Sequence, residues 1–237
     1  MRTLIMGVVG LVVLSANLSA ETIHYSADVV PDHSSLQNVF STHMTPGPSW
    51  SVSAGELTLT TTHPATIWFG NHSEVDPVPW DLADSSEGNF LSVRAKLAPS
   101  SSNWQLNIYD GNYRSNLRLA PDYLAYFTLA GYGNSYPIDT SEYHVYSILL
   151  ADGRVIYQVD GNEVYSGAAA AYSLKTLVTV GDGGYSANPD WGITTGSMLV
   201  DEVTIITHIP EPSTLVLLCM SAVGLLAYAW RRRRRLS

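Results

Sequence analysis

The sequence predicts an all-β protein built as a two-layered β-sandwich. Three observations support this: apolar and polar residues alternate along many short segments, turn signals such as Asp-Gly separate them, and no convincing amphipathic helix interrupts them. About a dozen such segments follow one another at spacings near ten residues. That spacing is typical of a β-sandwich.

The expected strands can be given in chain order. In the first half, alternation covers residues 56–61, 89–97, 104–108, 117–119 and 124–128. In the second half, strands are expected at residues 143–150, 155–159, 163–165, 177–182 and 197–207. Glycine-containing turns are expected at 110–112, 130–134, 152–153 and 160–162, because glycine readily adopts the positive φ of tight hairpins. Residues 21–48 show no clear period.

Residues 1–20 predict a secretory signal peptide. Arg2 supplies a short positive region, residues 4–14 are apolar, and Leu18-Ser19-Ala20 offers small residues for signal peptidase before Glu21. The alternative interpretation is an uncleaved N-terminal anchor. Either way, the following residues are expected outside the cytoplasmic membrane.

The C-terminal segment carries a second membrane signal. Pro210-Glu211-Pro212 precedes an uncharged apolar run at 213–230, which as a helix would be about 27 Å long. A hydrocarbon core is about 30 Å thick, so this run predicts a transmembrane helix. The basic tail that follows, Arg231, Arg232, Arg233, Arg234 and Arg235, is expected to stop in the cytoplasm.

These C-terminal features resemble the PEP-CTERM sorting signal of bacterial exported proteins, here over residues 208–237. The resemblance implies that an exosortase recognises Pro210, Glu211 and Pro212 and removes the tail. It further implies a Gram-negative producer of exopolysaccharide, an intermediate in the inner membrane, and a final place at the cell surface or in the extracellular matrix. The alternative is a plain single-pass anchor.

The charge of the body between these signals limits its partners. It holds six basic and twenty acidic residues, because half of the twelve Lys and Arg lie in the end segments, so its net charge is about −14. Such a surface repels nucleic acid. It is compatible with neutral glycans, and with anionic ones only through bridging cations. Cys219, the one cysteine, lies in the apolar run, so no disulfide is expected in the body.

The second half of the body holds three short motifs in a recurrent order: Val159-Asp160-Gly161, Val180-Gly181-Asp182 and Val200-Asp201-Glu202-Val203. Together they resemble the concanavalin A-like lectin/glucanase jelly roll in its LamG-like form. The resemblance covers about residues 50–207 and implies one jelly-roll domain at 21–207.

The resemblance allows both enzymes and binding modules. Catalytic members of this fold project carboxylates from one strand face, as in an E-x-D-x-x-E run, and a retaining glycosidase needs two carboxyl groups about 5 to 5.5 Å apart. No predicted strand carries such a spacing; Glu74 and Asp76 fall in a loop. Asp201 and Glu202 are adjacent and are expected on opposite faces. We therefore predict a protein that is not an enzyme.

An oxygen-rich loop offers a candidate metal site. Asp182, Asn188 and Asp190 lie in a glycine-containing stretch of the kind that supplies oxygen ligands to Ca²⁺. The alternative is an ordinary acidic loop with no ion. The seven histidines show no ligand spacing, which argues against zinc.

Tyrosine and tryptophan outnumber phenylalanine, and they favour surfaces where one end of the ring meets water. Tyr109, Tyr132, Tyr185 and Trp191 are expected at turns or loops and are candidates for stacking on a sugar. The alternative is that such rings fill the core. The predicted function is therefore an exported, non-catalytic module that binds carbohydrate or exopolysaccharide. The alternatives are a glycan-active hydrolase or lyase of the same fold, and a purely structural surface protein.

Overall fold

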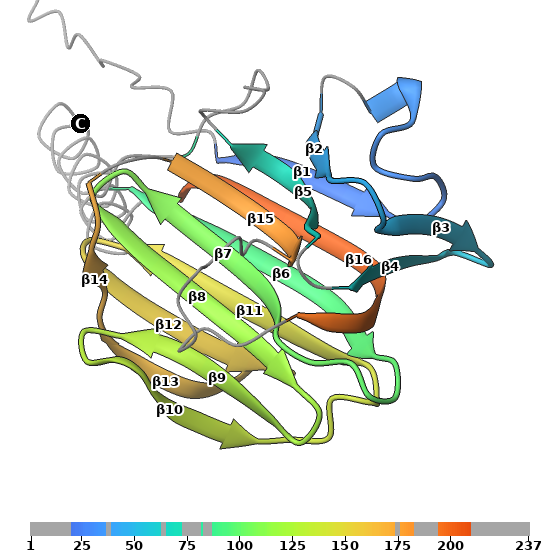
Figure 1. The fold of residues 1–237 in the computed structure, drawn as a ribbon. Coiled ribbons are helices and arrows are strands. Elements are labelled where there is room, and N and C mark those ends of the chain that lie inside the picture. The colour runs from blue at the N-terminus through green and yellow to red at the C-terminus, as the bar shows by residue number, and fades with distance from the viewer. Residues whose placement is uncertain are drawn as a thin grey trace, which may run out of the picture.

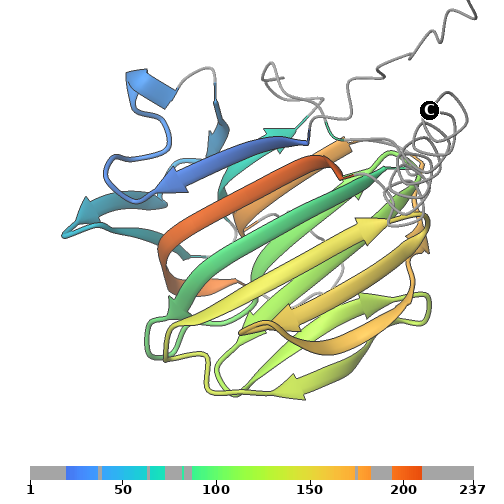
Figure 2. The same cartoon turned by 180° about the vertical axis from the view of Figure 1, so that it is seen from behind.

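The computed structural model describes residues 20–36, 39–62, 65–72, 82, 87–173, 176–182 and 194–209. Over these residues the chain forms two antiparallel sheets packed face to face, with one short 3-10 turn, η1 (Ser34–Leu36), and no α-helix (Figures 1 and 2). The predicted all-β sandwich is confirmed.

The first layer, sheet A, has eight strands, with β1 (Glu21–Ser26) off the main path and paired with β16. In spatial order the others are β13 (Asn162–Ala168), β12 (Arg154–Val159), β11 (His144–Ala151), β6 (Gly88–Leu97), β16 (Thr195–Ile209), β4 (Glu56–Thr62) and β3 (Ser49–Ser53).

The second layer, sheet B, also has eight strands, with β14 (Ala170–Ala171) paired with β8 at one edge. In spatial order the others are β10 (Gly131–Pro137), β9 (Tyr123–Thr128), β8 (Tyr113–Ala120), β7 (Trp104–Asp110), β15 (Thr176–Asp182), β5 (Ile67–His72) and β2 (Ser41–Met44).

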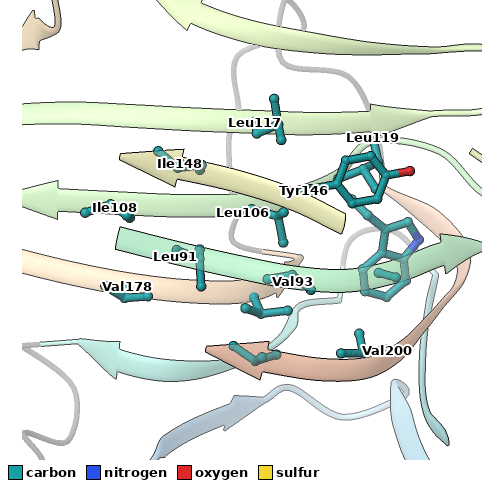
Figure 3. Packing of buried hydrophobic residues seen from close by; sticks show 14 of the residues in the cluster. Leu91, Val93, Leu106, Ile108, Leu117, Leu119, Tyr146, Ile148, Val178 and Val200 are labelled. Atoms are coloured by element: carbon teal, nitrogen blue, oxygen red, sulfur yellow. The ribbon is translucent and has the colours of Figure 1, made fainter. Parts of the chain in front are cut away.

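The core lies between the two sheets. Figure 3 shows aliphatic side chains from both layers gathered in one cluster, and they are fully buried, for example Leu91 and Val93 of sheet A and Leu106 and Leu117 of sheet B. Fully burying one such side chain contributes about 1.5–3 kcal/mol. For these strands, the period-two pattern therefore predicts correctly which side chains point inward.

Two local predictions are wrong. The turn predicted at residues 130–134 is shorter and lies at residues 129–130: β10 begins at Gly131, and the ladder with β9 shifts register between Tyr132 and Asn134. The glycines there serve a tight hairpin and a bulge, so Tyr132 and Tyr136 both lie inside a strand.

Asp201 and Glu202 are not on opposite faces, because β16 has an irregularity between Val200 and Glu202 in its pairing with β6. Both carboxylates are therefore solvent-accessible: Asp201 pairs with Arg94, and Glu202 Oε1 lies 3.6 Å from His24 Nδ1. Each carboxylate contacts its own partner, Arg94 or His24, so the two do not act as one carboxylate pair.

Residues 21–48, which showed no period, supply β1, η1 and β2. Among the described residues no helix is long and apolar enough to span a membrane. The predicted signal peptide (apart from Ala20) and the apolar run at 213–230 lie outside the residues that the structure describes.

Candidate functional site

The outward face of sheet B carries an ordered array of side chains. Because Leu106 and Ile108 of β7 point into the core, Gln105, Asn107 and Tyr109 point away from it. The same alternation on the neighbouring strands gives twelve positions, which we call the outer grid. They are Trp68, Gly70 and His72 on β5, Leu177, Thr179 and Gly181 on β15, Gln105, Asn107 and Tyr109 on β7, and Arg114, Asn116 and Arg118 on β8.

Strand register places the outer grid in three rows. Each row crosses β5, β15, β7 and β8 in that order. The rows are Trp68–Gly181–Gln105–Arg118, Gly70–Thr179–Asn107–Asn116 and His72–Leu177–Tyr109–Arg114.

A network of amides occupies the middle of the outer grid. Asn107 Nδ2 donates to Thr179 Oγ1 at 2.9 Å, and Asn116 Nδ2 donates to Gln105 Oε1 at 3.1 Å and also to Asn107 Oδ1. These side chains are at most 4% exposed. Buried polar groups need such partners, so the network is a structural requirement of a polar sheet face.

One side of the grid is aromatic. The Trp68 ring stacks between two histidines: its centroid lies 5.6 Å from that of His43 on β2 and 5.5 Å from that of His72, at interplanar angles of 21° and 26°. Gly70 lies between Trp68 and His72 on the same strand face and has no side chain to separate their rings. Trp68 is 6% exposed, so it offers little free ring surface.

The opposite corner of the grid is cationic. The Arg114 guanidinium carbon lies 4.2 Å from the centroid of the Phe127 ring and 5.3 Å from that of Tyr172. Tyr172 in turn packs edge-on against Tyr109 at 4.9 Å. Burial raises the pKa of Tyr109 to about 12, and the neighbouring Arg114 charge opposes that rise. The Arg114 Nε is buried without a hydrogen-bond acceptor among the described residues.

Exposure separates this corner from the rest of the face. Gln105 and Asn107 are each 4% exposed, whereas Arg114 and Tyr172 are only half-buried. The Arg114 corner is therefore the part of the grid that solvent, or a ligand, can reach.

No position of the outer grid holds a carboxylate. Asp110 and Asp182 are buried at the ends of β7 and β15, but they lie at opposite ends, since Asp110 pairs with Thr176 and Asp182 with Ile67. Six strand residues separate these ends, or about 20 Å at roughly 3.3 Å per residue. Glycosidase carboxyl pairs are about 5–9.5 Å apart, so these two cannot act as one.

The structure describes some of the predicted site residues and not others. Tyr109 lies on β7 and is 8% exposed, beside the Arg114 corner, and Asp182 is the last residue of β15 and 3% exposed. The Tyr132 side chain and four whole residues lie outside the described part: Tyr185, Asn188, Asp190 and Trp191. Among the described residues, no group of three or more His, Cys, Asp or Glu could hold a metal ion.

Sequence reasoning missed Arg114 and the amide network. The available signal was the run Gln105-Leu106-Asn107-Ile108-Tyr109, in which the outward residues are amides and a tyrosine.

Solved structures share this fold. The apo Crh5 transglycosylase is 15% identical, with 80% of this chain and 85% of that chain covered and a TM-score of 0.53. The complex of the Crh5 transglycosylase with NAG gives 17% identity, 79% and 85% coverage and a TM-score of 0.52. A prokaryotic β-1,3-1,4-glucanase (lichenase) derived from a mouse hindgut metagenome is 13% identical. The match covers 79% of this chain and 99% of that chain, with a TM-score of 0.49. No curated protein matches the sequence.

The body therefore has the concanavalin A-like jelly-roll fold that the sequence predicted. The C-terminal segment matches the PEP-CTERM protein-sorting motif over residues 208–234. This motif marks the chain for export and surface sorting, and it is a signal for processing by an exosortase.

Proposed function

We propose that the exported body binds a polysaccharide at the cell surface or in the extracellular matrix without cleaving it, and that it contacts this ligand through the Arg114 corner of the outer grid. The observation that carries this proposal is the absence of any carboxylate from its twelve positions. Glycoside hydrolysis uses a carboxylic acid together with a carboxylate base or nucleophile. The amides of the grid, such as Gln105 and Asn107, cannot perform those roles.

The Arg114 corner supports an acidic glycan as the ligand. The body has more than three acidic residues for each basic one, yet the Arg114 guanidinium contacts aromatic rings and forms no ion pair among the described residues. A planar guanidinium can bind the carboxylate of a uronic acid through two parallel hydrogen bonds, while the neighbouring rings contact the sugar. This proposal replaces the expectation that anionic glycans need a bridging cation.

A binding assay with the exported protein, purified from culture, tests this proposal. Polygalacturonate and a neutral β-glucan serve as probes, each with and without calcium, and released sugars are measured in the same wells. We expect binding to polygalacturonate without product release. Arg114→Lys keeps the charge but loses the paired hydrogen bonds, so binding should weaken about tenfold or more. Arg154→Lys is the control, since Arg154 is exposed on sheet A.

Each other outcome points to a different function. Release of sugar would establish a hydrolase or lyase of the same fold. Binding to the neutral glucan that Arg114→Lys leaves unchanged would contradict the acidic ligand class. Calcium-dependent binding would favour the predicted calcium site with Asp182, Asn188 and Asp190 as its ligands. No binding to either probe would favour a structural surface protein.

The route to the surface is part of the proposal. We infer that the chain passes through the inner membrane of a Gram-negative cell, held there by residues 213–230 until exosortase acts. Replacing Pro210, Glu211 and Pro212 by alanine should leave the body folded but retain it in the inner-membrane fraction. Normal release of that variant to the surface would contradict the route.

A further inference from the structure

The last two residues of β16 belong both to the folded body and to the sorting signal. The PEP-CTERM match begins at residue 208, whereas β16 continues to Ile209. Ile209 still pairs with Gly88 of β6. The sorting signal therefore begins inside the sheet, and Pro210 follows directly on its last paired residue.

The other processing junction lies beside it. Glu21, the first residue after the predicted signal peptide, pairs with Thr207 in the antiparallel ladder of β1 and β16. Figure 2 shows these two strands side by side in sheet A. The chain thus enters and leaves the body at the same end of one strand pair.

Specific contacts hold the end of β16 in place. His208 Nδ1 lies 2.6 Å from Glu87 Oε2, with both side chains 40% exposed. A Cβ on Gly88 would lie 3.2 Å from Ile209 Cβ, so the two strands approach closely there. We call Glu87, Gly88, His208 and Ile209 the latch.

The latch also contains a strained residue. His208 has φ of 57°, a conformation that is uncommon for residues other than glycine, although histidine adopts it more often than most. It falls in the irregular stretch of the β16–β6 ladder between Ile206 and Ile209. A positive φ at a residue other than glycine costs free energy, so the surrounding contacts of the latch hold His208 in this conformation.

We propose that the latch controls the access of exosortase to the sorting motif. Only residues 210–212 separate Ile209 from the expected membrane segment, and three extended residues reach about 10 Å. A membrane enzyme that approaches this short stretch meets the folded body. Detaching residues 208–209 from β6 lengthens the accessible segment, so the opening of the latch limits the processing rate.

Pulse–chase processing of the full-length chain in its exosortase-containing host tests the proposal, with loss of the C-terminal tail as the readout. Glu87→Ala removes the contact with His208 and should raise the processing rate about two- to fivefold, the range expected for a partly exposed contact between polar side chains. A Gly-Ser-Gly-Ser insertion between Ile209 and Pro210 should raise the rate at least as much. In that variant, Glu87→Ala should have no further effect.

The matched control is Glu202→Ala, which removes the contact with His24 on the same strand pair but away from the latch. It should leave the processing rate unchanged. Equal acceleration by Glu202→Ala would overturn the proposal, because general loosening of the sheet would then explain the effect. Wild-type rates for both Glu87→Ala and the insertion would overturn it too. If Glu87→Ala prevents folding, the insertion decides, since it leaves the sequence of the body intact.

Discussion

The hydroxyl of Tyr157, on β12 of sheet A, donates a hydrogen bond to the backbone carbonyl of Phe127, on β9 of sheet B, at 2.9 Å. The same oxygen accepts from the backbone N–H of Asn116 on β8 at 3.2 Å. The β8–β9 ladder ends at the pair Leu117–Tyr126, so Asn116 and Phe127 are the next residues beyond it. The Tyr157 hydroxyl bridges these two residues from the opposite sheet and so extends the ladder. A single fully buried side chain thus links the two layers behind the outer grid.

Tyr157→Phe should lower the free energy of unfolding by about 1–3 kcal/mol, because the ring stays while two buried backbone groups lose a partner. Urea denaturation of the purified protein gives this value. Tyr123→Phe is the control: Tyr123 is 42% exposed, and its change should be within about 0.5 kcal/mol. Equal effects for the two variants would mean that the hydroxyl does not stabilise the link.

The strands and most hairpins could be predicted because their signals are local. Alternation and an Asp-Gly turn both act within a few residues, and β11, β12 and β13 were placed correctly on those grounds. The same reasoning could not predict the local bulges. One irregular residue pair at Val200 and Glu202 shifts the register, and no sequence period reveals it.

The outer grid could not be predicted, because its rows join distant parts of the chain. Trp68, Gly181 and Gln105 become neighbours only through the order of β5, β15 and β7 in the sheet. That order is set by the long-range packing of the whole sandwich. The sequence therefore indicated the fold but not which side chains share a face.

Gly70→Ala should abolish folding or destabilise the body severely. A Cβ at Gly70 would lie 1.9 Å from the Val178 carbonyl oxygen on β15, and φ there is 147°. Gly55→Ala is the control, because φ is 76° but no atom lies within 4 Å of its Cβ. We expect the control to cost only the strain of positive φ, about 1–2 kcal/mol. The melting temperature and the soluble yield are measured for both variants. Similar losses of stability in the two would contradict the close approach of β5 and β15.

The Asp160 carboxylate connects the β12–β13 turn with the start of β11. Burial alone would raise its pKa, but hydrogen bonds from the Val145 N–H and from His144 outweigh that effect and lower the pKa below its ordinary value. Oδ1 lies 2.9 Å from the Val145 nitrogen, and Oδ2 lies 2.7 Å from His144 Nδ1. The charged form of Asp160 therefore stabilises the folded state.

The sign of the pH effect follows from that direction. A carboxyl whose pKa is lowered by folding stabilises the protein above its ordinary pKa, near 4, and this contribution is lost as the pH falls through the lower folded value. Asp160→Asn keeps a side chain that tolerates the positive φ of 50° but removes the titration. We expect it to lower stability at pH 7 and to reduce the loss between pH 5 and pH 3, measured by urea denaturation at each pH. Asp152→Asn, which makes the same substitution in the corresponding Asp-Gly turn with φ of 47°, is the matched control. If the two variants lose stability in parallel with the wild type on acidification, Asp160 does not carry this part of the acid sensitivity.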